Sequence, residues 1–324
     1  QFRREGLKEK KWSADHLQHP VRVDAMELDT ILLMMLRMSR DLLVQSHISK
    51  HLEEPRYELL RNISGQFYNQ VLVDEATDFS PIQLACMESL TRLETGSFFA
   101  CGDFNQRITP WGTRTHEQMH WAIDGMDTRS ITTVYRQSQK LNDFSKKLIE
   151  SLGGDRDTQG QLPEHLNHPG VAPALLEEMA ALEDVAIWLV ERIQEVEKIV
   201  DIGQLPTIAV LVNAENHVKP MAEALNHLLE DINLRAVACV EGQSLGVGSD
   251  VRVFNVQHIK GLEFEAVFFV GVDVLAEQMP DLFGKYLYVG ATRAATYLGM
   301  SCETVLPDSL SPLRNVFVDR WGKP

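Results

Sequence analysis

Short apolar runs alternate with longer amphipathic segments through the second half of the chain, and this alternation constrains the fold more than any other feature. Runs of strand length lie at residues 207–212, 235–240, 251–256, 266–270 and 297–301. Segments with helical spacing of apolar residues lie at 182–200, 216–229 and 282–295. Alternating strands and helices of these lengths predict a mostly parallel sheet covered by helices, with ligands at the carboxyl ends of the strands. The predicted fold class is therefore α/β.

The first part of the chain shows the same alternation less regularly. Residues 23–52 hold apolar side chains at helical spacing, which predicts one long helix or two short ones facing mainly the core, with Met34 and Met35 inside. Further strands are predicted at 70–73, 97–101 and 131–134, with helices at 82–93 and from about Ser138. Ser80 is the expected N-cap of the first of these helices, with Pro81 at its first position.

The length and composition indicate an ordinary globular protein. A chain of 324 residues, 44% apolar and 24% charged, is expected to form about two domains, and we place the boundary between residues 128 and 129. No apolar stretch approaches the roughly 20 residues that span a bilayer. We therefore expect a cytoplasmic protein with no membrane partner.

Charge and cysteine content narrow the function classes. The formal net charge of −15 argues against an extended nucleic-acid coat, although a local basic cleft remains compatible with it. Cys86, Cys101, Cys239 and Cys302 show no paired spacing, so we expect reduced core or strand residues without a disulfide or a zinc site.

Three of the predicted strands end in polar residues that can bind ligands. The sequences that follow them are Asp-Glu-Ala-Thr-Asp at 74–78, Gly-Asp-Phe-Asn-Gln at 102–106 and Tyr-Arg-Gln at 135–137. Adjacent carboxylates at a strand end are typical of a magnesium nucleotide site. The simpler alternative is that an acidic helix start merely follows a buried strand.

Two longer blocks sharpen the interpretation. Val-Gln-His-Ile-Lys-Gly-Leu-Glu-Phe spans residues 256–264, and Tyr-Val-Gly-Ala-Thr-Arg-Ala spans 288–294. Taken in order with the three strand ends, these blocks resemble motifs II to VI of the UvrD/Rep-like superfamily 1 DNA helicases. The resemblance implies two RecA-like domains, each a parallel sheet flanked by helices, with ATP and Mg²⁺ between them and single-stranded DNA running across both. The first domain would be incomplete in residues 1–128 and the second complete in residues 129–324.

The resemblance assigns the phosphate chemistry to residues of the first domain. Asp74 would hold Mg²⁺ through water, and Glu75 would orient and deprotonate the attacking water. Gln106 would sense the γ-phosphate and connect nucleotide state to the DNA track.

The second domain would supply the remaining nucleotide contacts. Tyr135 resembles the residue that stacks on adenine, and Arg136 and Arg293 resemble two arginine fingers. Gly261 would permit a tight turn, while Glu263 would accept a hydrogen bond from the ribose. Two separate arginines suit this chemistry, because charge spread over the phosphoryl oxygens needs donors from more than one side.

The expected DNA contacts are fewer. Gln257, His258 and Lys260 match family positions that contact the DNA backbone. Trp111 is the candidate platform for a base, because a flat aromatic face binds any base. An alternative left open by the sequence is that Trp111 only packs between a turn and a helix.

The chain also departs from the family pattern. Thr77 stands where the family usually has Gln, which is expected to loosen coupling to the γ-phosphate. The 324 residues contain no Gly-Lys-Ser or Gly-Lys-Thr phosphate loop. We expect that loop on a preceding segment, or lost in a natural relative. The chain alone is expected to bind ATP weakly and not to turn it over.

A competing motif is His-Glu-Gln-Met-His at 116–120, which fits the zinc-protease pattern. It lies within the helicase order and lacks an obvious third ligand, so we expect no zinc there.

The function expected from these features is an ATP-dependent DNA helicase or translocase acting on single-stranded or partly duplex DNA. The alternative is a helicase-derived subunit that binds DNA or a protein partner, such as a nuclease or defence subunit, without hydrolysis in a repair or antiphage complex. Glu75, Arg136 and Arg293 together favour the enzyme, because a scaffold has no need of a general base and two fingers.

Overall fold

The computed structural model describes residues 23–109, 111–131, 133, 136–154, 160–163, 168–199, 206–243 and 245–322. The chain divides into two compact units, which are described separately below. Unit 1 comprises residues 1–127 and unit 2 residues 128–324, one residue from the boundary predicted above.

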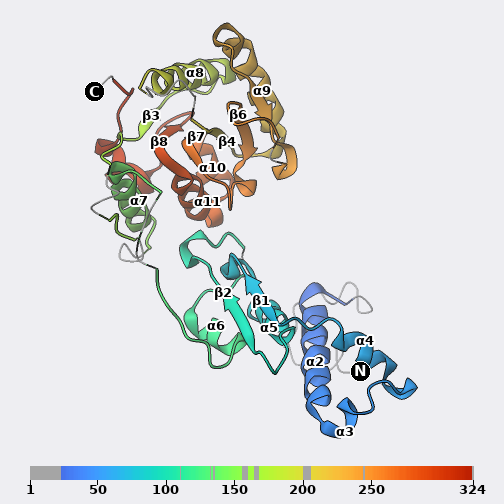
Figure 1. Cartoon of the computed structure of the whole chain (residues 1–324). Coiled ribbons are helices and arrows are strands. Elements are labelled where there is room, and N and C mark those ends of the chain that lie inside the picture. The colour runs from blue at the N-terminus through green and yellow to red at the C-terminus, as the bar shows by residue number, and fades with distance from the viewer. Residues whose placement is uncertain are drawn as a thin grey trace, which may run out of the picture. The chain divides into compact units, whose positions relative to one another are not determined.

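Unit 1 combines a two-stranded parallel sheet with helices (Figure 1). Strand β1 (Gln70–Val73) pairs with β2 (Ser97–Ala100), so that Val73 lies opposite Ala100. Both strands confirm the prediction, β2 ending one residue early. The helices are α2 (Ala25–Val44), α3 (Ser46–Ser49), α4 (Glu58–Ser64), α5 (Pro81–Ser89) and α6 (His116–Ala122).

Helix α5 begins as the sequence predicts and ends earlier. Ser80 caps it through a capping box with Gln83, and Pro81 occupies the first turn. The helix was predicted to reach residue 93 but ends at Ser89. The reason is that the following residues pair with Tyr68, whose N–H donates to the Leu90 carbonyl at 2.8 Å and whose carbonyl accepts from Arg92 N–H at 2.9 Å.

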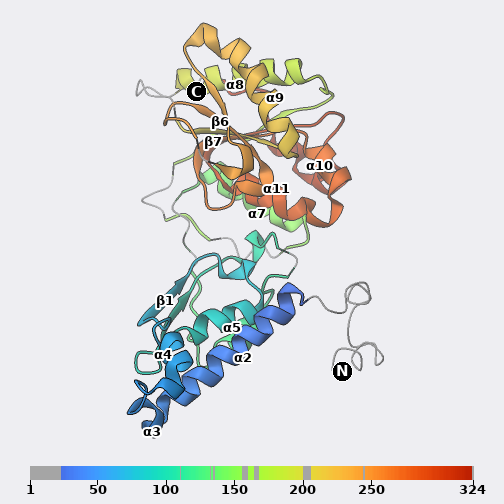
Figure 2. The same cartoon turned by 90° about the vertical axis from the view of Figure 1, so that its right-hand side faces the viewer.

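Helix α2 carries more apolar surface than unit 1 buries. Leu33 and Leu36 are buried in the core that contains α5, and Figure 2 shows α2 lying along α5. Met34 and Met35, predicted to be core residues, are 59% and 49% exposed. The prediction that this segment faces mainly the core is therefore wrong. Apolar residues surround most of the helix, and only one of its stripes contacts α5.

Unit 2 is built on a six-stranded parallel sheet in the order β3-β8-β7-β4-β6-β5. This confirms the predicted α/β class with a mostly parallel sheet flanked by helices. The strands are β3 (Ala174–Leu176), β4 (Ile208–Val212), β5 (Ala236–Ala238), β6 (Val251–Asn255), β7 (Phe264–Phe269) and β8 (Ala294–Ser301). All five residues of β4 are buried, as expected for a central parallel strand.

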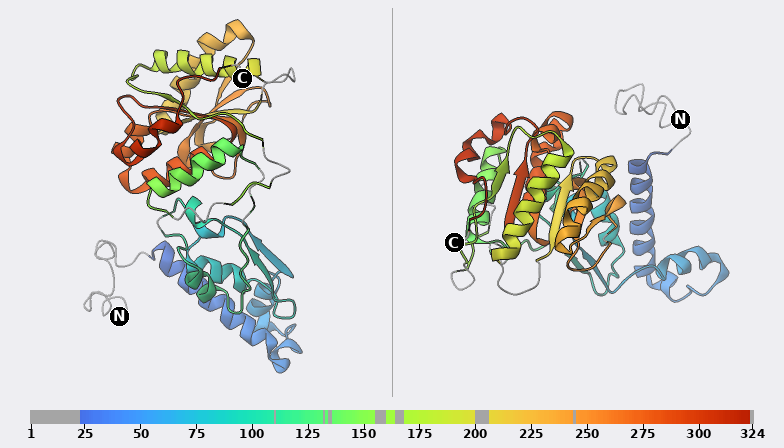
Figure 3. Two further views of the ribbon diagram at one scale, coloured as in Figure 1. Left: turned by 90° about the vertical axis from the view of Figure 1, so that its left-hand side faces the viewer. Right: turned by 90° about the horizontal axis from the view of Figure 1, so that it is seen from above.

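Helices cover both faces of this sheet. Helices α8 and α9 lie on one face and α7 and α11 on the other, as Figures 1 and 2 show and the left view of Figure 3 repeats from the other side. The helices are α7 (Gln139–Ser151), α8 (Leu182–Ile199), α9 (Glu215–Leu229), α10 (Val272–Gln278) and α11 (Pro280–Thr292). None of the helices in the described ranges combines the length and the apolarity that a bilayer crossing requires.

In unit 2, β3 and α10 were not predicted, and one predicted strand is not formed by the described residues. Strand β3 has three residues and α10 has seven, too few for a clear periodicity. At the strand predicted for 131–134, Thr133 forms only an isolated bridge with Gln161. Thr132 and Val134 lie outside the described residues.

Gly290 lets α11 lie close to the sheet. A Cβ at this position would stand 2.6 Å from Cε2 of Phe269 and 3.0 Å from Cδ1 of Leu211. Phe269 is 1% exposed, so its ring has no free space to move into. The glycine in the block at 288–294 therefore has a packing role.

We expect Gly290→Ala to lower the free energy of unfolding of unit 2 by about 1–3 kcal/mol, because overpacking outweighs the gain in helix propensity. Gly284→Ala in the same helix is the matched control, since its Cβ would meet Leu152 at an ordinary 3.4 Å. The control should be neutral or stabilising by up to about 1 kcal/mol. Urea denaturation measures both, and equal effects of the two substitutions would refute the packing role.

Candidate functional site

The carboxyl ends of β1 and β2 bring two of the predicted motifs together in unit 1. Asp74 and Glu75 follow β1, and Cys101 follows β2. Because the strands are parallel, their exits lie side by side: Cys101 N–H donates to the Val73 carbonyl at 2.9 Å, and Ala76 N–H donates to the Cys101 carbonyl at 2.8 Å. The predicted acids therefore lie at an edge of the sheet, as expected.

Asp74 is exposed, and its neighbours orient it. Its Oδ1 accepts hydrogen bonds from Glu75 N–H at 2.8 Å and from the Cys101 thiol at 3.2 Å. Glu75 adopts a left-handed backbone conformation with φ of 53°. Such a conformation is unfavourable for a residue other than glycine and is often found at functional sites.

Cys101 is a residue of this region that no sequence motif singled out. The four cysteines are free, and Cys86, Cys239 and Cys302 are buried as predicted, but Cys101 is exposed. Partial desolvation and the hydrogen bond to Asp74 raise the pKa of its thiol, which therefore stays protonated as a donor. Its position directly after a strand parallel to β1 was the available signal.

The loops after β1 and β2 are joined to each other. Thr77 is fully buried, and its hydroxyl donates to the Asp103 carbonyl at 3.0 Å. A Cβ on Gly102 would come within 3.0 Å of the Thr77 nitrogen, so this close approach needs a glycine. Asp103 in turn caps the 3₁₀ turn Phe104–Gln106 by accepting from Asn105 N–H at 2.8 Å. The turn that contains Gln106 is thus joined to the loop after β1 through Thr77.

Trp111 and the two histidines of the zinc-like motif lie further along unit 1. Trp111 is 58% exposed, so it does not pack into a core. His116 and His120 lie on α6, and the His116 ring contacts the Phe104 ring edge-on with centroids 4.9 Å apart. Over the described stretches, no three His, Cys, Asp or Glu side chains gather in a way that could hold a metal ion.

In unit 2, three of the predicted nucleotide residues gather at the amino ends of β7 and β8. Glu263 precedes β7 and Arg293 precedes β8, and Phe264 N–H donates to the Arg293 carbonyl at 3.1 Å. Arg136 forms an ion pair with Glu263. The adjoining Ser138 N–H donates to the Ala295 carbonyl at 2.8 Å, which fixes this segment beside β8.

Glu263 and Arg293 thus lie before the amino ends of strands, whereas ligands were expected at the carboxyl ends. Strands β6 and β7 both pair in parallel with β4, so the connection 256–263 runs from the carboxyl end of β6 to the amino end of β7. The block at 256–264 therefore spans the sheet, and its last residues lie at the opposite edge from its first.

The two candidate arginine fingers have different surroundings. The Arg136 side chain is 71% exposed, and an exposed pair like that with Glu263 contributes only about 0–1 kcal/mol, so either partner is readily released. Arg293 is 7% exposed and follows the last residue of α11. Its Nε donates to the Val289 carbonyl at 3.3 Å. Tyr135, the predicted adenine-stacking residue, lies outside the described residues.

The predicted DNA contacts of unit 2 lie in the same connection. Gln257 and His258 are exposed on the 3₁₀ turn Val256–His258, directly after β6. His258 Nε2 lies 3.6 Å from Oε2 of Glu215, and Lys260 is half-buried. Gly261 has φ of 79°, in the region that favours glycine, which agrees with the tight turn predicted for it.

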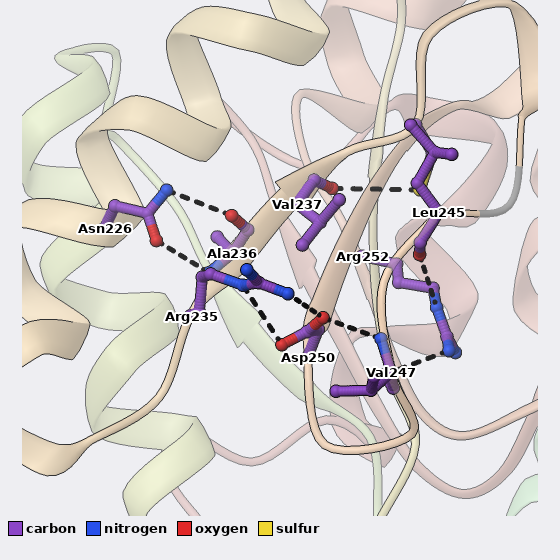
Figure 4. Close-up of polar contacts among 9 residues, drawn as sticks. Asn226, Arg235, Ala236, Val237, Leu245, Val247, Asp250 and Arg252 are labelled. Carbon is purple, nitrogen blue, oxygen red and sulfur yellow. Dashed lines mark hydrogen bonds and ion pairs between the residues drawn. The ribbon is translucent and has the colours of Figure 1, made fainter.

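A polar network fixes the edge of the sheet where β5 and β6 begin (Figure 4). Arg235 Nη2 pairs with Oδ2 of Asp250 at 2.7 Å, and the same oxygen accepts from Val247 N–H at 2.8 Å. The hydrogen bond from Arg235 holds the pKa of Asp250 below its ordinary value. Arg252 donates to the carbonyl oxygens of Leu245 and Val247. The start of β6 is thus anchored by charge.

Residues 250–301 match the UvrD-like helicase C-terminal domain. This UvrD-like segment begins at Asp250 and ends at Ser301, so it contains β6, β7 and β8. Its candidate site residues are Gln257, His258, Lys260, Gly261, Glu263 and Arg293.

The other two comparisons say less about the relationships of this chain. A search of curated proteins gives no match. Among solved structures, the chain is similar to the C-terminal domain of a possible DNA helicase from Lactobacillus plantarum WCFS1. The two are 16% identical with a TM-score of 0.39, over 57% of this chain and 97% of that one.

Proposed function

We propose that this chain is part of an ATP-dependent DNA helicase or translocase of the UvrD/Rep-like kind. The observation that carries the proposal is the UvrD-like segment at 250–301, in which the last residues of the two motif blocks meet where Phe264 N–H donates to the Arg293 carbonyl. Glu263 and Arg293 come from different ends of that segment, and Arg136 joins them through its ion pair with Glu263. A carboxylate that accepts a hydrogen bond from the ribose and two guanidinium groups that reach the phosphates would suit a nucleoside triphosphate.

Unit 1 would supply the groups for hydrolysis. Asp74 suits Mg²⁺, which typically binds one or two carboxylates together with phosphates and water, and its Oδ1 is already oriented by Glu75 N–H. The metal would neutralise charge on the phosphates when bound. Glu75 would accept the proton of the attacking water, and Gln106 would report on the γ-phosphate through the loop that Thr77 joins to the acids.

The proposal also predicts how DNA binds. Binding should be single-stranded, tolerant of sequence and strongly dependent on salt, because a local basic track must work against a net charge of −15. Trp111 would stack on a base and Lys260 would lie near phosphates. Removal of one side chain that contacts a phosphate should make the plot of log affinity against log salt concentration less steep, by about one unit of slope.

We expect Trp111→Ala to weaken single-strand binding by roughly 5- to 150-fold, because base stacking contributes about 1–3 kcal/mol. Fluorescence anisotropy with a labelled oligothymidine measures this over a range of salt concentrations. Trp121→Ala is the matched control, since Trp121 is a 60% exposed tryptophan of the same unit outside the motifs. If both variants bind like the wild type, Trp111 is not the platform.

ATPase assays on a protein that combines this chain with a phosphate loop separate the enzyme from the alternative of a binding subunit without hydrolysis. The active enzyme should hydrolyse ATP faster when single-stranded DNA is added. DNA binding by that protein without any ATP turnover would favour the binding subunit.

A further inference from the structure

An exposed tryptophan stands between two arginines in the 107–114 loop of unit 1, which follows the 3₁₀ turn Phe104–Gln106. Trp111 is 58% exposed, Arg107 is half-buried and Arg114 is exposed. The resemblance to the helicase family assigns a role to Trp111 and none to the two arginines. An aromatic face combined with positive charge is what proteins use to bind single-stranded nucleic acid. The loop therefore holds more of a nucleic-acid site than its tryptophan alone.

The 107–114 loop is fixed to the segment that follows β1. Thr113 is fully buried, and its N–H and its hydroxyl both donate to the Phe79 carbonyl, at 2.9 and 2.7 Å. The Thr109 hydroxyl donates to the Asp78 carbonyl at 2.9 Å. A Cβ on Gly112 would stand 2.3 Å from a backbone carbonyl oxygen of the same segment, an approach that only glycine permits. The backbone on both sides of Trp111 is thus held in place.

The Arg107 side chain lies against the backbone of this loop. Its Nη1 donates to the Thr109 carbonyl. Its Cδ lies 3.0 Å from where a Cβ on Gly112 would stand, and Gly112 directly follows Trp111 in the chain. A guanidinium group has five N–H donors, so the contact with Thr109 orients the group while using one of them. The charge of Arg107 is therefore preorganised close to the backbone that carries Trp111.

The loop has a local excess of positive charge. Burial lowers the pKa of Arg107, and the nearby charge of Arg114 lowers it further. Asp78 raises that pKa by less than Arg114 lowers it, and its Oδ1 also accepts from Ile108 N–H at 3.3 Å. Glu117, the acid of α6, interacts instead with the N-cap hydroxyl and the two histidines of its own helix. Two cations held near each other disfavour each other's charge, and an anion bound beside them would relieve this repulsion.

We propose that Arg107 and Arg114 form a phosphate clamp, which binds the backbone phosphates of single-stranded DNA next to the base that stacks on Trp111. The inference rests on the proposed function, because it takes single-stranded DNA as the ligand, and it adds the phosphate contacts of unit 1. A planar guanidinium group can donate to two oxygens of one phosphate. The clamp also provides positive charge where DNA approaches a chain of net charge −15.

The salt dependence of DNA binding by the full chain tests the clamp. Fluorescence anisotropy with a labelled oligothymidine gives log affinity against log salt concentration. Arg107→Gln and Arg114→Gln should each make this plot less steep by about 0.7–1 unit of slope, because each removes one phosphate contact. Trp111→Ala should lower the affinity and leave the slope unchanged. Arg56→Gln is the matched control, since the Arg56 side chain is 65% exposed in the same unit and pairs with Glu54.

The outcomes separate the clamp from the proposed function. An unchanged slope in either arginine variant, while the wild type binds DNA, would overturn the clamp and leave the proposed function standing. A wild-type chain that binds no single-stranded DNA at low salt would overturn both.

A second probe distinguishes a phosphate contact from mere support of the tryptophan. An abasic oligodeoxyribose phosphate of the same length keeps the phosphates and lacks the bases. Arg107→Gln should weaken binding of both probes by the same factor, whereas Trp111→Ala should weaken binding of the oligothymidine alone. Arg107→Lys retains the charge and should keep the wild-type slope. If Arg107→Gln weakens binding of the oligothymidine alone, Arg107 only holds Trp111 in place and the clamp is refuted.

Discussion

Arg293→Ala is expected to lower the kcat of DNA-stimulated ATP hydrolysis by a factor on the order of 10³–10⁵, in the active protein that combines this chain with a phosphate loop. The guanidinium would stabilise charge that develops on the transferring phosphoryl group, so nucleotide affinity should change little. An exposed ion pair of about 0–1 kcal/mol could not produce an effect of this size. Steady-state ATPase assays with and without single-stranded DNA measure it, and Arg136→Ala belongs in the same series.

Burial of Arg293 makes a folding control necessary. Because the residue is 7% exposed, its loss could also destabilise unit 2, so thermal unfolding of each variant must accompany the rates. Arg293→Lys should not restore turnover, since a point charge cannot replace a planar fork that spans two oxygens. Arg235→Ala removes the ion pair with Asp250 in the same unit and should keep its kcat. If folded Arg293→Ala shows DNA-stimulated ATP turnover close to that of the wild type, Arg293 does not act in hydrolysis.

Glu75 should show opposite effects on activity and stability. Glu75→Gln is expected to lower kcat by about 10²–10⁴, the usual contribution of a general base. Glu75→Gly should be equally inactive yet raise the free energy of unfolding of unit 1 by about 1 kcal/mol, because glycine adopts the left-handed conformation with φ of 53° without strain. ATPase assays and urea denaturation together measure the pair of effects.

Glu75→Ala separates the two causes. It removes the carboxylate but keeps a Cβ in the left-handed conformation, so it should lose activity without gaining stability. A Glu75→Gly variant that is less stable than wild type would show that the surrounding hydrogen bonds, rather than backbone strain, dominate at this position.

Much of the fold was readable because apolar periodicity reports secondary structure directly. Strands β1 and β6 and helix α9 lie within a residue of their predicted bounds. The sequence predicts less well which apolar side chains are buried. The pattern of α2 shows which of its sides are apolar, but it cannot show which of them meets another element, and Met34 and Met35 are exposed for that reason.

The sequence predicts the positions of the candidate site residues that follow strand ends, but not the positions of those that lie in connections between strands. Asp74 and Glu75 follow a strand, and parallel pairing places them beside the loop that leads to Gln106. The position of Glu263 and Arg293 at the amino edge follows from a connection of only eight residues between β6 and β7, whose path the sequence does not state.

The bond between Thr77 and Asp103 has a mechanical consequence for unit 1. The segments that follow β1 and β2 are joined by the buried Thr77 hydroxyl and by the Ala76 N–H. A displacement of the carboxylates after β1 is therefore expected to displace the turn that contains Gln106. Thr77 lacks the longer side chain that the family usually has at this position. It would thus connect the two loops while other groups contact the phosphate.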